Sequence, residues 1–500
     1  MNRRDFIGGT AVSAAAFASR ALLAQATGPK PALASDPERP QYHLLPKSNW
    51  MNDPNGPIYF NGRYHMFFQY NPEAAVWGNM SWNHAISEDM LHWKNQPVAF
   101  TMKPGGPDAA GCFSGSTIAV PHNGGTRVYA LYTGVVRDRE HATIHNEGLR
   151  ESQCLAWSDH PMLLSWTKEE SPVIDAPPPN LRVTGFRDPS VWRHGERYLM
   201  AVGSGIEDVG GCLLLYSSTD LRHWKYLHPV AVGSWTGRPT PDPVDDGEMW
   251  ECPELFPLGD RWVLVYSSLR RVFWQSGMMD ERALRFIPSN GGMLDNGAFY
   301  APKTQVDAHG RRILWGWVPE KRSEAEMRHA GWSGMMSLPR VLRLDSEGTL
   351  LINPLPEIAI LREKELQVRN SGTSQLVTLP ASTGEAICEG NTGRGFDVVI
   401  CLGTQTLRLQ YLPEKHRIQI DEAEVHLRPQ DSPVVHMFAD GSVLELFISG
   451  LAARTVRFYF QGESAPDVTV QVEGSPVTLQ GWTLRPISNN RLTTLSDMHL

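Results

Sequence analysis

Short hydrophobic segments rich in aromatic and β-branched residues recur along the chain, and polar turn residues separate them. Few long stretches place apolar residues at the spacing of an amphipathic helix. Short segments of this composition, bounded by Gly, Pro, Asn and Asp, are typical of β-strands. They include 64–70, 128–132, 198–202, 261–266 and 312–317. The pattern therefore predicts an all-β protein.

The predicted strands fall into units that repeat between about residues 50 and 345. A unit opens with a polar or acidic turn, continues with two or three strands, and closes in a sequence that is nearly the same at 87–93 and 218–224. Units start near residues 53, 114, 188, 251 and 299, at spacings of roughly 50 to 75 residues, the size of a four-stranded propeller blade. Five units predict a five-bladed β-propeller, and irregular all-β structure is the alternative.

A second region of short strands follows a proline-marked connector at 351–363. The hairpin signal Asp440-Gly441 and the close spacing of these strands predict a β-sandwich. We therefore expect a propeller over 41–350, a sandwich over 364–487 and a polar tail over 488–500. The sandwich is interpreted as structural, with carbohydrate binding as the alternative.

The N-terminal segment has the composition of an export signal. Arg3 and Arg4 precede an apolar stretch at 6–18, and a small-x-small cleavage site follows at 24–26. This resembles a bacterial twin-arginine signal peptide over 1–26, with a plain Sec signal as the alternative. The prolines of 27–40 predict an extended linker. No later segment has about 20 uninterrupted apolar residues, so we expect export to the periplasm or medium without a membrane span.

The overall composition argues against several classes of function. The formal net charge of −8 provides no basic surface for nucleic acid. The length of 500 residues is that of two or three domains. Six scattered cysteines lack a C-x-x-C pair and do not require disulfides. Because there is no phosphate loop, dinucleotide fingerprint or H-E-x-x-H sequence, neither a cofactor nor a metal is expected.

Three unit openings carry a carboxylate, namely Asp53, Asp188 and Glu251, each closely followed by proline. Taken alone, an Asp-Pro pair is usually turn chemistry. In a propeller, however, equivalent positions of different blades face one another around the central channel. Carboxylates that converge there repel one another, which stability alone does not favour. The repeat therefore predicts an acidic functional site.

Paired carboxylates are the machinery of glycoside hydrolysis. One attacks the anomeric carbon or activates water, and the other donates a proton to the leaving oxygen. Glutamate suits the acid role because its reference pKa is higher than that of aspartate. Glu251 and Glu254 compete for this role, and strand alternation predicts that only one of them faces the channel. Glu251 is preferred because it matches the register of Asp53 and Asp188.

Three sequences carry a family resemblance: Trp-Met-Asn-Asp-Pro-Asn-Gly at 50–56, Phe-Arg-Asp-Pro at 186–189 and Trp-Glu-Cys-Pro at 250–253. In order and spacing they resemble the signature motifs of glycoside hydrolase family 32, the invertase, inulinase and levanase family. Phe-Ser-Gly-Ser at 113–116 adds to the likeness, which covers roughly residues 41 to 485.

The resemblance implies a retaining β-fructofuranosidase that acts on sucrose, fructo-oligosaccharides or fructans without a cofactor. It implies that Asp53 is the nucleophile, Glu251 the acid/base and Asp188 the stabiliser of the transition state. Arg187 would orient a carboxylate or a sugar hydroxyl. The other predicted substrate-binding residues are the hydrogen-bonding Asn52, Gln69 and Ser114 and the wall-forming Trp50, Trp77 and Phe113.

Other functions also fit an acidic propeller. One is an inverting glycosidase that acts on arabinose or xylose chains, and another is a non-catalytic sugar-binding propeller. The first and third motifs argue against the former, and the three carboxylates argue against the latter. Fructosyl transfer is a further alternative, although Trp50 resembles the hydrolase form. The choice among sucrose, inulin and levan stays open, as do exo or endo action and oligomeric state.

Overall fold

The computed structural model describes residues 33–141, 143, 148–421, 423–460, 462, 464–474 and 477–488. Within these residues the chain is almost entirely β-structure, with one short α-helix, α2 (Glu324–Ala330). This confirms the predicted all-β class. The predicted signal peptide at 1–26 and nearly all of the predicted tail lie outside the described residues. No helix in the described part of the chain is long and apolar enough to cross a bilayer.

The first three groups of four consecutive strands each form an antiparallel sheet. The first group is β1 (Asn49–Phe60), β2 (Arg63–Asn71), β3 (Ser81–Ser87) and β4 (Trp93–Asn95). The second is β5 (Gly111–His122), β6 (Gly125–Arg137), β7 (Leu149–Ser158) and β8 (Thr167–Lys168). The third is β9 (Val183–His194), β10 (Arg197–Ile206), β11 (Gly210–Ser218) and β12 (Lys225–Val232).

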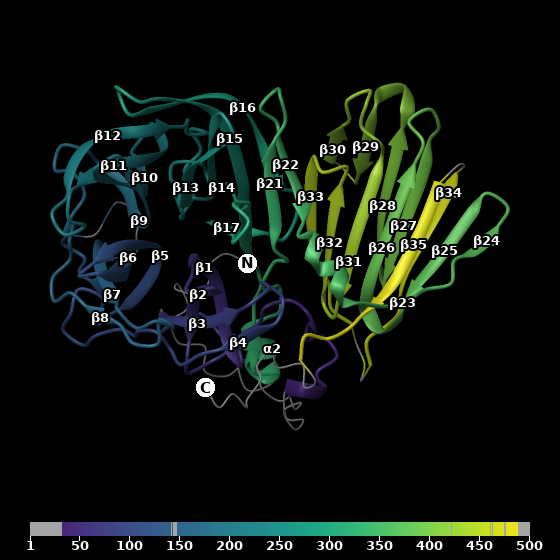
Figure 1. Ribbon diagram of the computed structural model, residues 1–500, viewed down its shortest axis with the longest axis horizontal. Coiled ribbons are helices and arrows are strands. Elements are labelled where there is room, and N and C mark those ends of the chain that lie inside the picture. The colour runs from purple at the N-terminus through teal and green to yellow at the C-terminus, as the bar shows by residue number, and fades with distance from the viewer. Residues whose placement is uncertain are drawn as a thin grey trace, which may run out of the picture.

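Two further groups continue this arrangement. One is β13 (Glu251–Leu258), β14 (Arg261–Ser268), β15 (Arg271–Asp280) and β16 (Arg285–Asp295). The other is β17 (Tyr300–Val306), β18 (Arg312–Val318), β21 (Arg340–Leu344) and β22 (Leu350–Pro354), with β20 (Met335–Met336) beside β18. These sheets are the blades of a propeller-like part, which occupies the left of Figure 1.

The first strand of each blade lies innermost, and these strands form a ring. β1 contacts β5, β5 contacts β9, β9 contacts β13, β13 contacts β17, and β17 contacts β1. A short strand, β19 (Trp332–Ser333), pairs in parallel with the start of β1 and so joins distant parts of the sequence in one sheet. The ring brings residues that are far apart in the chain to one central region.

Every inner strand is interrupted by a β-bulge near its start. Two residues of the inner strand oppose one residue of its partner, which bends the strand and changes which face the next side chain occupies. The bulges lie between Met51 and Pro54, Cys112 and Gly115, Arg187 and Ser190, Glu251 and Glu254, and Tyr300 and Lys303. All the carboxylates predicted for the site stand at these bulges.

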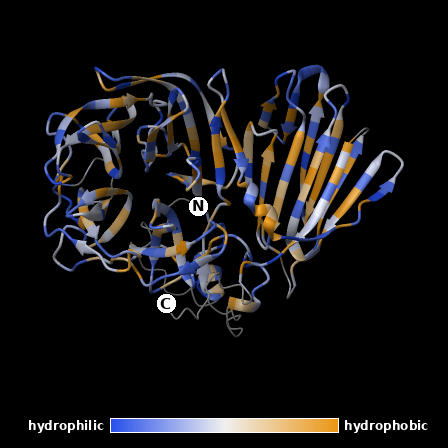
Figure 2. Ribbon diagram, viewed as in Figure 1, coloured by the Kyte–Doolittle hydropathy of each residue, from blue (hydrophilic) through white to orange (hydrophobic). Residues whose placement is uncertain are grey.

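The C-terminal part contains two stacked sheets at the right of Figure 1. One sheet contains β24 (Arg369–Ser371), β25 (Ser374–Leu379), β34 (Val468–Gly474), β27 (Phe396–Leu402), β28 (Gln405–Leu412), β29 (Arg417–Ile420) and β30 (Ala423–His426). The other contains β33 (Ala452–Arg457), β32 (Val443–Ile448), β31 (Val434–Asp440), β26 (Thr383–Gly390), β35 (Val477–Leu484) and β23 (Arg362–Glu365). Figure 2 shows hydrophobic and hydrophilic residues alternating along these strands, as expected when one face is buried.

Buried charges join the two parts. β33 pairs with β16 at Asp295, so the second sheet continues from a blade. Between them the fully buried Arg340 binds Asp295 Oδ2 at 2.8 Å and Glu445 Oε2 at 2.7 Å. His43 binds Asp440 through Nδ1 at 2.8 Å and Glu445 through Nε2 at 3.1 Å. Burial lowers the pKa of His43, but the two carboxylates outweigh it and raise that pKa to about 9.

The described part of the predicted linker, residues 33–40, differs from a free extended segment. It begins with a short 3-10 helix (Leu33–Ser35), and Arg39 is fully buried. Asp36 Oδ2 accepts a hydrogen bond of 2.6 Å from the indole of Trp332. Proline content indicated an extended chain, but polar contacts with the body of the protein hold this segment in place.

Candidate active site

Asp53 lies in the β1 bulge and is fully buried. Asn52 Nδ2 donates to its Oδ1 at 2.9 Å, and Ser114 Oγ of the β5 bulge donates to its Oδ2 at 2.5 Å. The indole of Trp50 donates to Asn52 Oδ1 at 2.7 Å, which fixes the amide that holds the carboxylate. These contacts hold the Asp53 carboxylate in one orientation at the inner face of the ring.

Asp188 reaches the same place from β9. Its Oδ2 accepts the backbone N–H of Cys252 at 2.9 Å, and its own N–H donates to Thr133 Oγ1 at 2.9 Å. The thiol of Cys252 lies 3.4 Å from Asp188 Oδ2 and 3.4 Å from Asp53 Oδ2. The distance between Asp53 Oδ2 and Asp188 Oδ2 therefore cannot exceed the sum of these two distances. Asp188 has a φ of 63°, a conformation that costs energy in a residue with a side chain and is common at functional sites.

Glu251 is the first residue of β13, and two donors contact its carboxylate. Arg187 Nε donates to Oε1 at 2.9 Å, and the phenol of Tyr300 donates to Oε2 at 2.8 Å. Burial tends to lower the pKa of Arg187, but Glu151 and Glu251 raise it well above its usual value, so Arg187 is a cation. Burial and the nearby Glu251 raise the pKa of Tyr300 well above its usual value, so this phenol remains a donor.

Glu151 on β7 supports this arrangement from behind. Its Oε1 accepts Arg187 Nη1 at 2.9 Å, and its Oε2 accepts the backbone N–H of Phe186 at 2.6 Å. Arg187 thus lies between two carboxylates and presents its Nε to Glu251. Sequence reasoning missed Glu151 because it stands on the third strand of its blade, where the repeat gives no signal.

Two further residues were absent from the predicted site. Tyr300 opens the fifth unit, so strict application of the repeat could have found it. Cys252 is the other, because its thiol and its backbone N–H both contact the aspartates. All six cysteines of the chain are free, and Cys252 is fully buried.

The prediction that Glu251 occupies the same strand register as Asp53 and Asp188 was wrong, although Glu251 does join the cluster. Three residues directly before proline share a positive φ, namely Asp188 at 63°, Cys252 at 47° and Ala301 at 52°. At the strand position that Asp188 occupies in β9, β13 therefore carries Cys252. Glu251 stands one residue earlier, where the neighbouring inner strands carry Arg187 and Tyr300. This offset is why Arg187 and Tyr300 both reach Glu251.

The expectation that Glu251 and Glu254 face opposite sides was also wrong. The two bulged residues between them oppose one partner residue, so Glu251 and Glu254 are effectively two positions apart and share a face. Glu254 lies deeper along the ring, where Thr304 Oγ1 donates to it at 2.8 Å and Lys303 Nζ lies 3.4 Å away. It borders a cavity of about 380 Å³ at the other end of the inner strands.

The aromatic residues predicted for the wall lie together. Trp50, Trp77 and Phe113 belong to one hydrophobic cluster, with the rings of Trp77 and Phe113 edge to face at 6.0 Å. Gln69 lies opposite the β1 bulge, but its amide donates to the backbone oxygen of Cys112 at 2.9 Å. Gln69 stands on β2 and therefore links β2 to β5.

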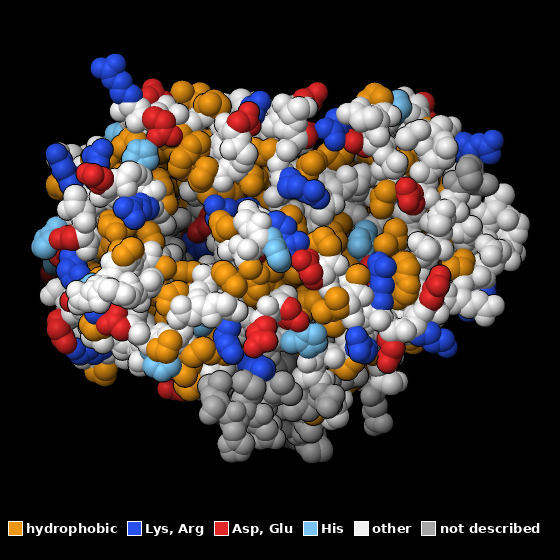
Figure 3. Space-filling view, viewed as in Figure 1, with side chains coloured by type: hydrophobic (Ala, Val, Ile, Leu, Met, Phe, Trp, Pro, Cys, Tyr) orange, Lys and Arg blue, Asp and Glu red, His pale blue; other side chains and the backbone are white. Residues whose placement is uncertain are grey.

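This arrangement suits acid–base and nucleophilic chemistry on a neutral polar substrate. Asp53 and Asp188 are anchored by N–H, O–H and S–H donors, whereas Glu251 lies beside a cation and a phenol. The described residues contain no group of three or more His, Cys, Asp and Glu side chains placed to hold a metal ion. Figure 3 shows acidic and basic side chains interspersed over the viewed face, without a continuous basic surface.

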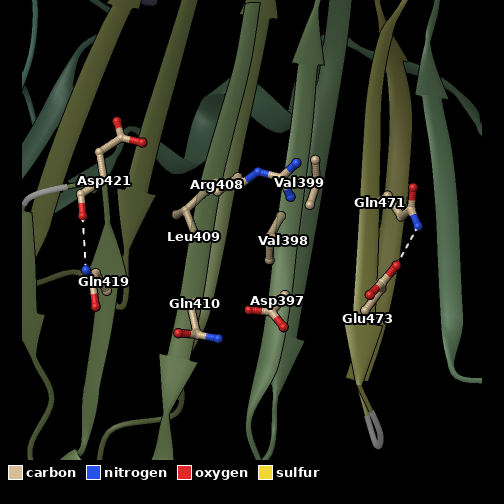
Figure 4. A pocket seen from close by; sticks show the side chains of 10 residues that line it. All are labelled: Asp397, Val398, Val399, Arg408, Leu409, Gln410, Gln419, Asp421, Gln471 and Glu473. Carbon is tan, nitrogen blue, oxygen red and sulfur yellow. Dashed lines mark hydrogen bonds between the residues drawn. The ribbon is translucent and has the colours of Figure 1, made fainter.

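A hollow of about 550 Å³ lies far from this cluster, on the seven-stranded sheet (Figure 4). Carboxylates, amides, one arginine and aliphatic residues line it, including Asp397, Arg408, Gln410 and Glu473. No aromatic ring contributes to its lining, so it lacks the stacking surface that sugar-binding sites usually have. None of the residues predicted for the site lies there.

Comparison with known proteins gives a consistent result. A family model described as the glycosyl hydrolases family 32 N-terminal domain matches residues 43–354. The chain is 33% identical to sucrose-6-phosphate hydrolase of Bacillus subtilis (strain 168), over 91% of this chain and 96% of that enzyme. It is 34% identical to the cell wall isozyme of β-fructofuranosidase of Zea mays, over 70% of this chain and 61% of that enzyme.

Solved structures with the same architecture include the GH32 β-fructofuranosidase BmSUC1 of Bombyx mori. It superposes with a TM-score of 0.76 at 28% identity, over 95% of this chain and 99% of that one. Fructan 1-exohydrolase IIa of Cichorium intybus superposes with a TM-score of 0.73 at 27% identity, over 90% of this chain and 98% of that one.

Proposed function

The chain belongs to glycoside hydrolase family 32, and we propose that it releases terminal β-D-fructofuranosyl units from sucrose or fructans. It is a glycosidase that acts on O-glycosyl bonds. The observation that carries the proposal is the convergence of Asp53, Asp188 and Glu251 from three inner strands on one hydrogen-bonded cluster. Structures of relatives in complex with sucrose and with 1-kestose support the substrate class.

In the first step, Asp53 attacks C2 of the fructosyl unit. The bond between C2 and the glycosidic oxygen breaks, and Glu251 transfers its proton to that oxygen as the leaving sugar departs. Asn52, Ser114 and Cys252 keep the Asp53 carboxylate aligned for attack. The product of this step is a covalent fructosyl ester of Asp53.

In the second step, Glu251 takes a proton from water, and the water oxygen bonds to C2 as the bond to Asp53 breaks. Fructose leaves with its anomeric configuration retained. Arg187 and Tyr300 hold Glu251 in one place through both steps. Asp188 accepts hydrogen bonds from fructosyl hydroxyls, and these bonds strengthen as the sugar acquires oxocarbenium character.

A panel of substrates tests the proposed activity. Purified protein is incubated with sucrose, 1-kestose, inulin, levan, arabinan and xylan, and the products are resolved by chain length. We expect free fructose from one or more of the first four substrates. Release of arabinose or xylose without fructose would overturn the proposal. Turnover equal to that of an Asp53→Ala variant would identify a sugar-binding protein without activity.

We also propose the finer architecture, a five-bladed propeller over 41–350 followed by a β-sandwich over 364–487. The cyclic contacts of the inner strands support the blade count. A single hydrophobic core between the two C-terminal sheets supports the sandwich. A crystal structure checks both, and a sixth blade or an open ring would contradict the count.

The segment 1–26 leads us to propose export by the twin-arginine route. The paired Arg3 and Arg4 before an apolar stretch carry this proposal. Replacement of both arginines by lysine should leave active, unprocessed protein in the cytoplasm of the expressing cells. Normal processing and export of that variant would contradict the twin-arginine assignment.

A further inference from the structure

Arg187 is a buried cation that two glutamates from different blades share. Glu151 Oε1 accepts its Nη1 at 2.9 Å, whereas Glu251 Oε1 accepts its Nε at 2.9 Å and lies 2.8 Å from its Nη2. We call these three residues the charge triad, and none of their side chains is more than 6% exposed. A buried arginine is balanced by one anion. The triad therefore has a surplus of negative charge whenever both glutamates are ionised.

The partners of the two glutamates decide which of them can hold a proton. Glu151 accepts from two N–H groups, Arg187 Nη1 and the backbone N–H of Phe186 at 2.6 Å. Neither group can accept a hydrogen bond, so a proton on Glu151 would have no acceptor in these contacts. Glu251 Oε2 instead meets the phenol of Tyr300 at 2.8 Å, and a hydroxyl can turn to accept as well as donate. The proton of the triad therefore has its place on Glu251.

Other charged and titratable groups lie around the charge triad and come from the neighbouring inner strands. They are Asp53 on β1, Asp188 on β9, Asp242 before β13, Cys252 and Glu254 on β13, and Tyr300 and Lys303 on β17. Lys303 lies 3.4 Å from Glu254, deeper along the ring. Arg187 is therefore the cation that serves Glu151 and Glu251. The nearby aspartates add to the negative charge that opposes ionisation of Glu251.

We propose that Glu151 is a positioning residue that allows Glu251 to keep its proton until the leaving oxygen takes it. This inference rests on the proposed function and concerns the protonation of its acid. Glu151 acts through Arg187 and touches no substrate. While Glu251 is protonated, Glu151 balances the charge of Arg187. After Glu251 has given its proton to the glycosidic oxygen, Arg187 stabilises the second carboxylate, and the proton taken from water in the second step restores the first state.

The test is the pH dependence of kcat/KM for sucrose in Glu151→Gln. Without the charge of Glu151, only Glu251 can balance Arg187 within the triad, which favours the ionised form of Glu251. The decline of kcat/KM on the alkaline side reports loss of the proton from the acid of the free enzyme. We expect this decline to move to lower pH by about one unit or more. A merely structural role would instead lower kcat/KM equally at every pH.

Two further variants test the balance of charge independently. Glu151→Asp restores the carboxylate and should return the alkaline decline toward its position in the intact protein. Arg187→Gln removes the cation but leaves the negative charge of Glu151 near Glu251, so the decline should move to higher pH. Thermal unfolding shows which variants are folded. If Glu151→Gln does not fold, the direction of the shift in Arg187→Gln decides.

Glu385→Gln is the matched control. Glu385 is also a buried carboxylate that binds an arginine, Arg362 at 2.6 Å, but it stands on β26 in the C-terminal part. This variant should keep the pH profile of the intact protein.

Three outcomes would overturn the inference. They are an unmoved alkaline decline in Glu151→Gln, shifts in the same direction in Glu151→Gln and Arg187→Gln, and a Glu151→Asp variant that behaves like Glu151→Gln. Failure of the intact protein to release fructose from sucrose or 1-kestose would refute the proposed function instead, because Glu251 would then have no leaving oxygen to protonate.

Discussion

The inner strands of the propeller-like part and the strands of the seven-stranded C-terminal sheet are built on the same pleated backbone but differ in register. Each inner strand is bulged near its start. In contrast, β27 pairs with β28 and with β34 without a shift. Regular alternation along β27 buries Val398 and Ile400 in one core and leaves Asp397 on the outer face.

The bulges explain why one region has a candidate active site and the other does not. A regular strand presents every second side chain to a face, so polar residues on it spread along the strand. A bulge makes adjacent residues available to one face, and Asn52 and Asp53 are such a pair. Repetition around a ring then concentrates these residues at one point. The hollow on the C-terminal sheet has carboxylates too, but no comparable convergence.

The largest expected difference between the regions is in catalysis. Glu251→Gln should lower kcat by about three orders of magnitude, because it removes the proposed proton donor and general base. Steady-state kinetics with sucrose would measure this, and thermal unfolding would show that the variant is folded. Glu473→Gln is the matched control in the hollow of the C-terminal sheet and should keep full activity. Similar activity in both variants would refute the assignment of the site.

The contact between the propeller-like part and the C-terminal part should be sensitive to pH. The pKa of His43 is raised from 6.5 to about 9 in the folded protein, so its stabilising charge is complete below about pH 6.5 and is lost as pH rises through about 9. We expect the free energy of unfolding to fall over this range by up to about 3 kcal/mol. Denaturant unfolding at a series of pH values measures it.

The control for this prediction is an exposed histidine. His43→Asn should be less stable at neutral pH and should flatten the fall between pH 6.5 and 9. His426→Asn, on the exposed surface of β30, should leave the fall unchanged. An unchanged pH profile in His43→Asn would show that the His43 contacts with Asp440 and Glu445 do not stabilise the junction between the propeller-like part and the C-terminal part.

A smaller effect is expected from a substitution that strains the backbone of a bulge. Ala301 is fully buried with a φ of 52°, a conformation that a β-branched residue adopts poorly. Ala301→Val should cost about 2 kcal/mol of unfolding free energy and lower kcat, because it displaces Tyr300. Thr406→Val, on a regular and exposed stretch of β28, should change stability by less than about 0.5 kcal/mol. Equal effects at both positions would contradict a special role for the bulges.

The sequence predicted the strands, the repeat and the three carboxylates because period-two patterns and recurrent Pro-containing openings are local signals. It did not predict that Glu254 shares a face with Glu251, because a bulge depends on how two strands pair. It did not predict Glu151, which reaches the site only through Arg187. The contacts that hold 33–40 in place were missed because Asp36 and Arg39 are fixed by a residue hundreds of positions away or by backbone oxygens.

The central claim is that Asp53 forms a covalent bond to the fructosyl unit, with Glu251 as acid and base on the opposite side. Hydrolysis of sucrose in the presence of methanol tests this directly, because methanol traps the intermediate as a stable methyl fructoside whose configuration NMR can read. Double displacement predicts methyl β-D-fructofuranoside alone, and none from Asp53→Ala. Formation of the α-anomer by the intact protein would contradict the account.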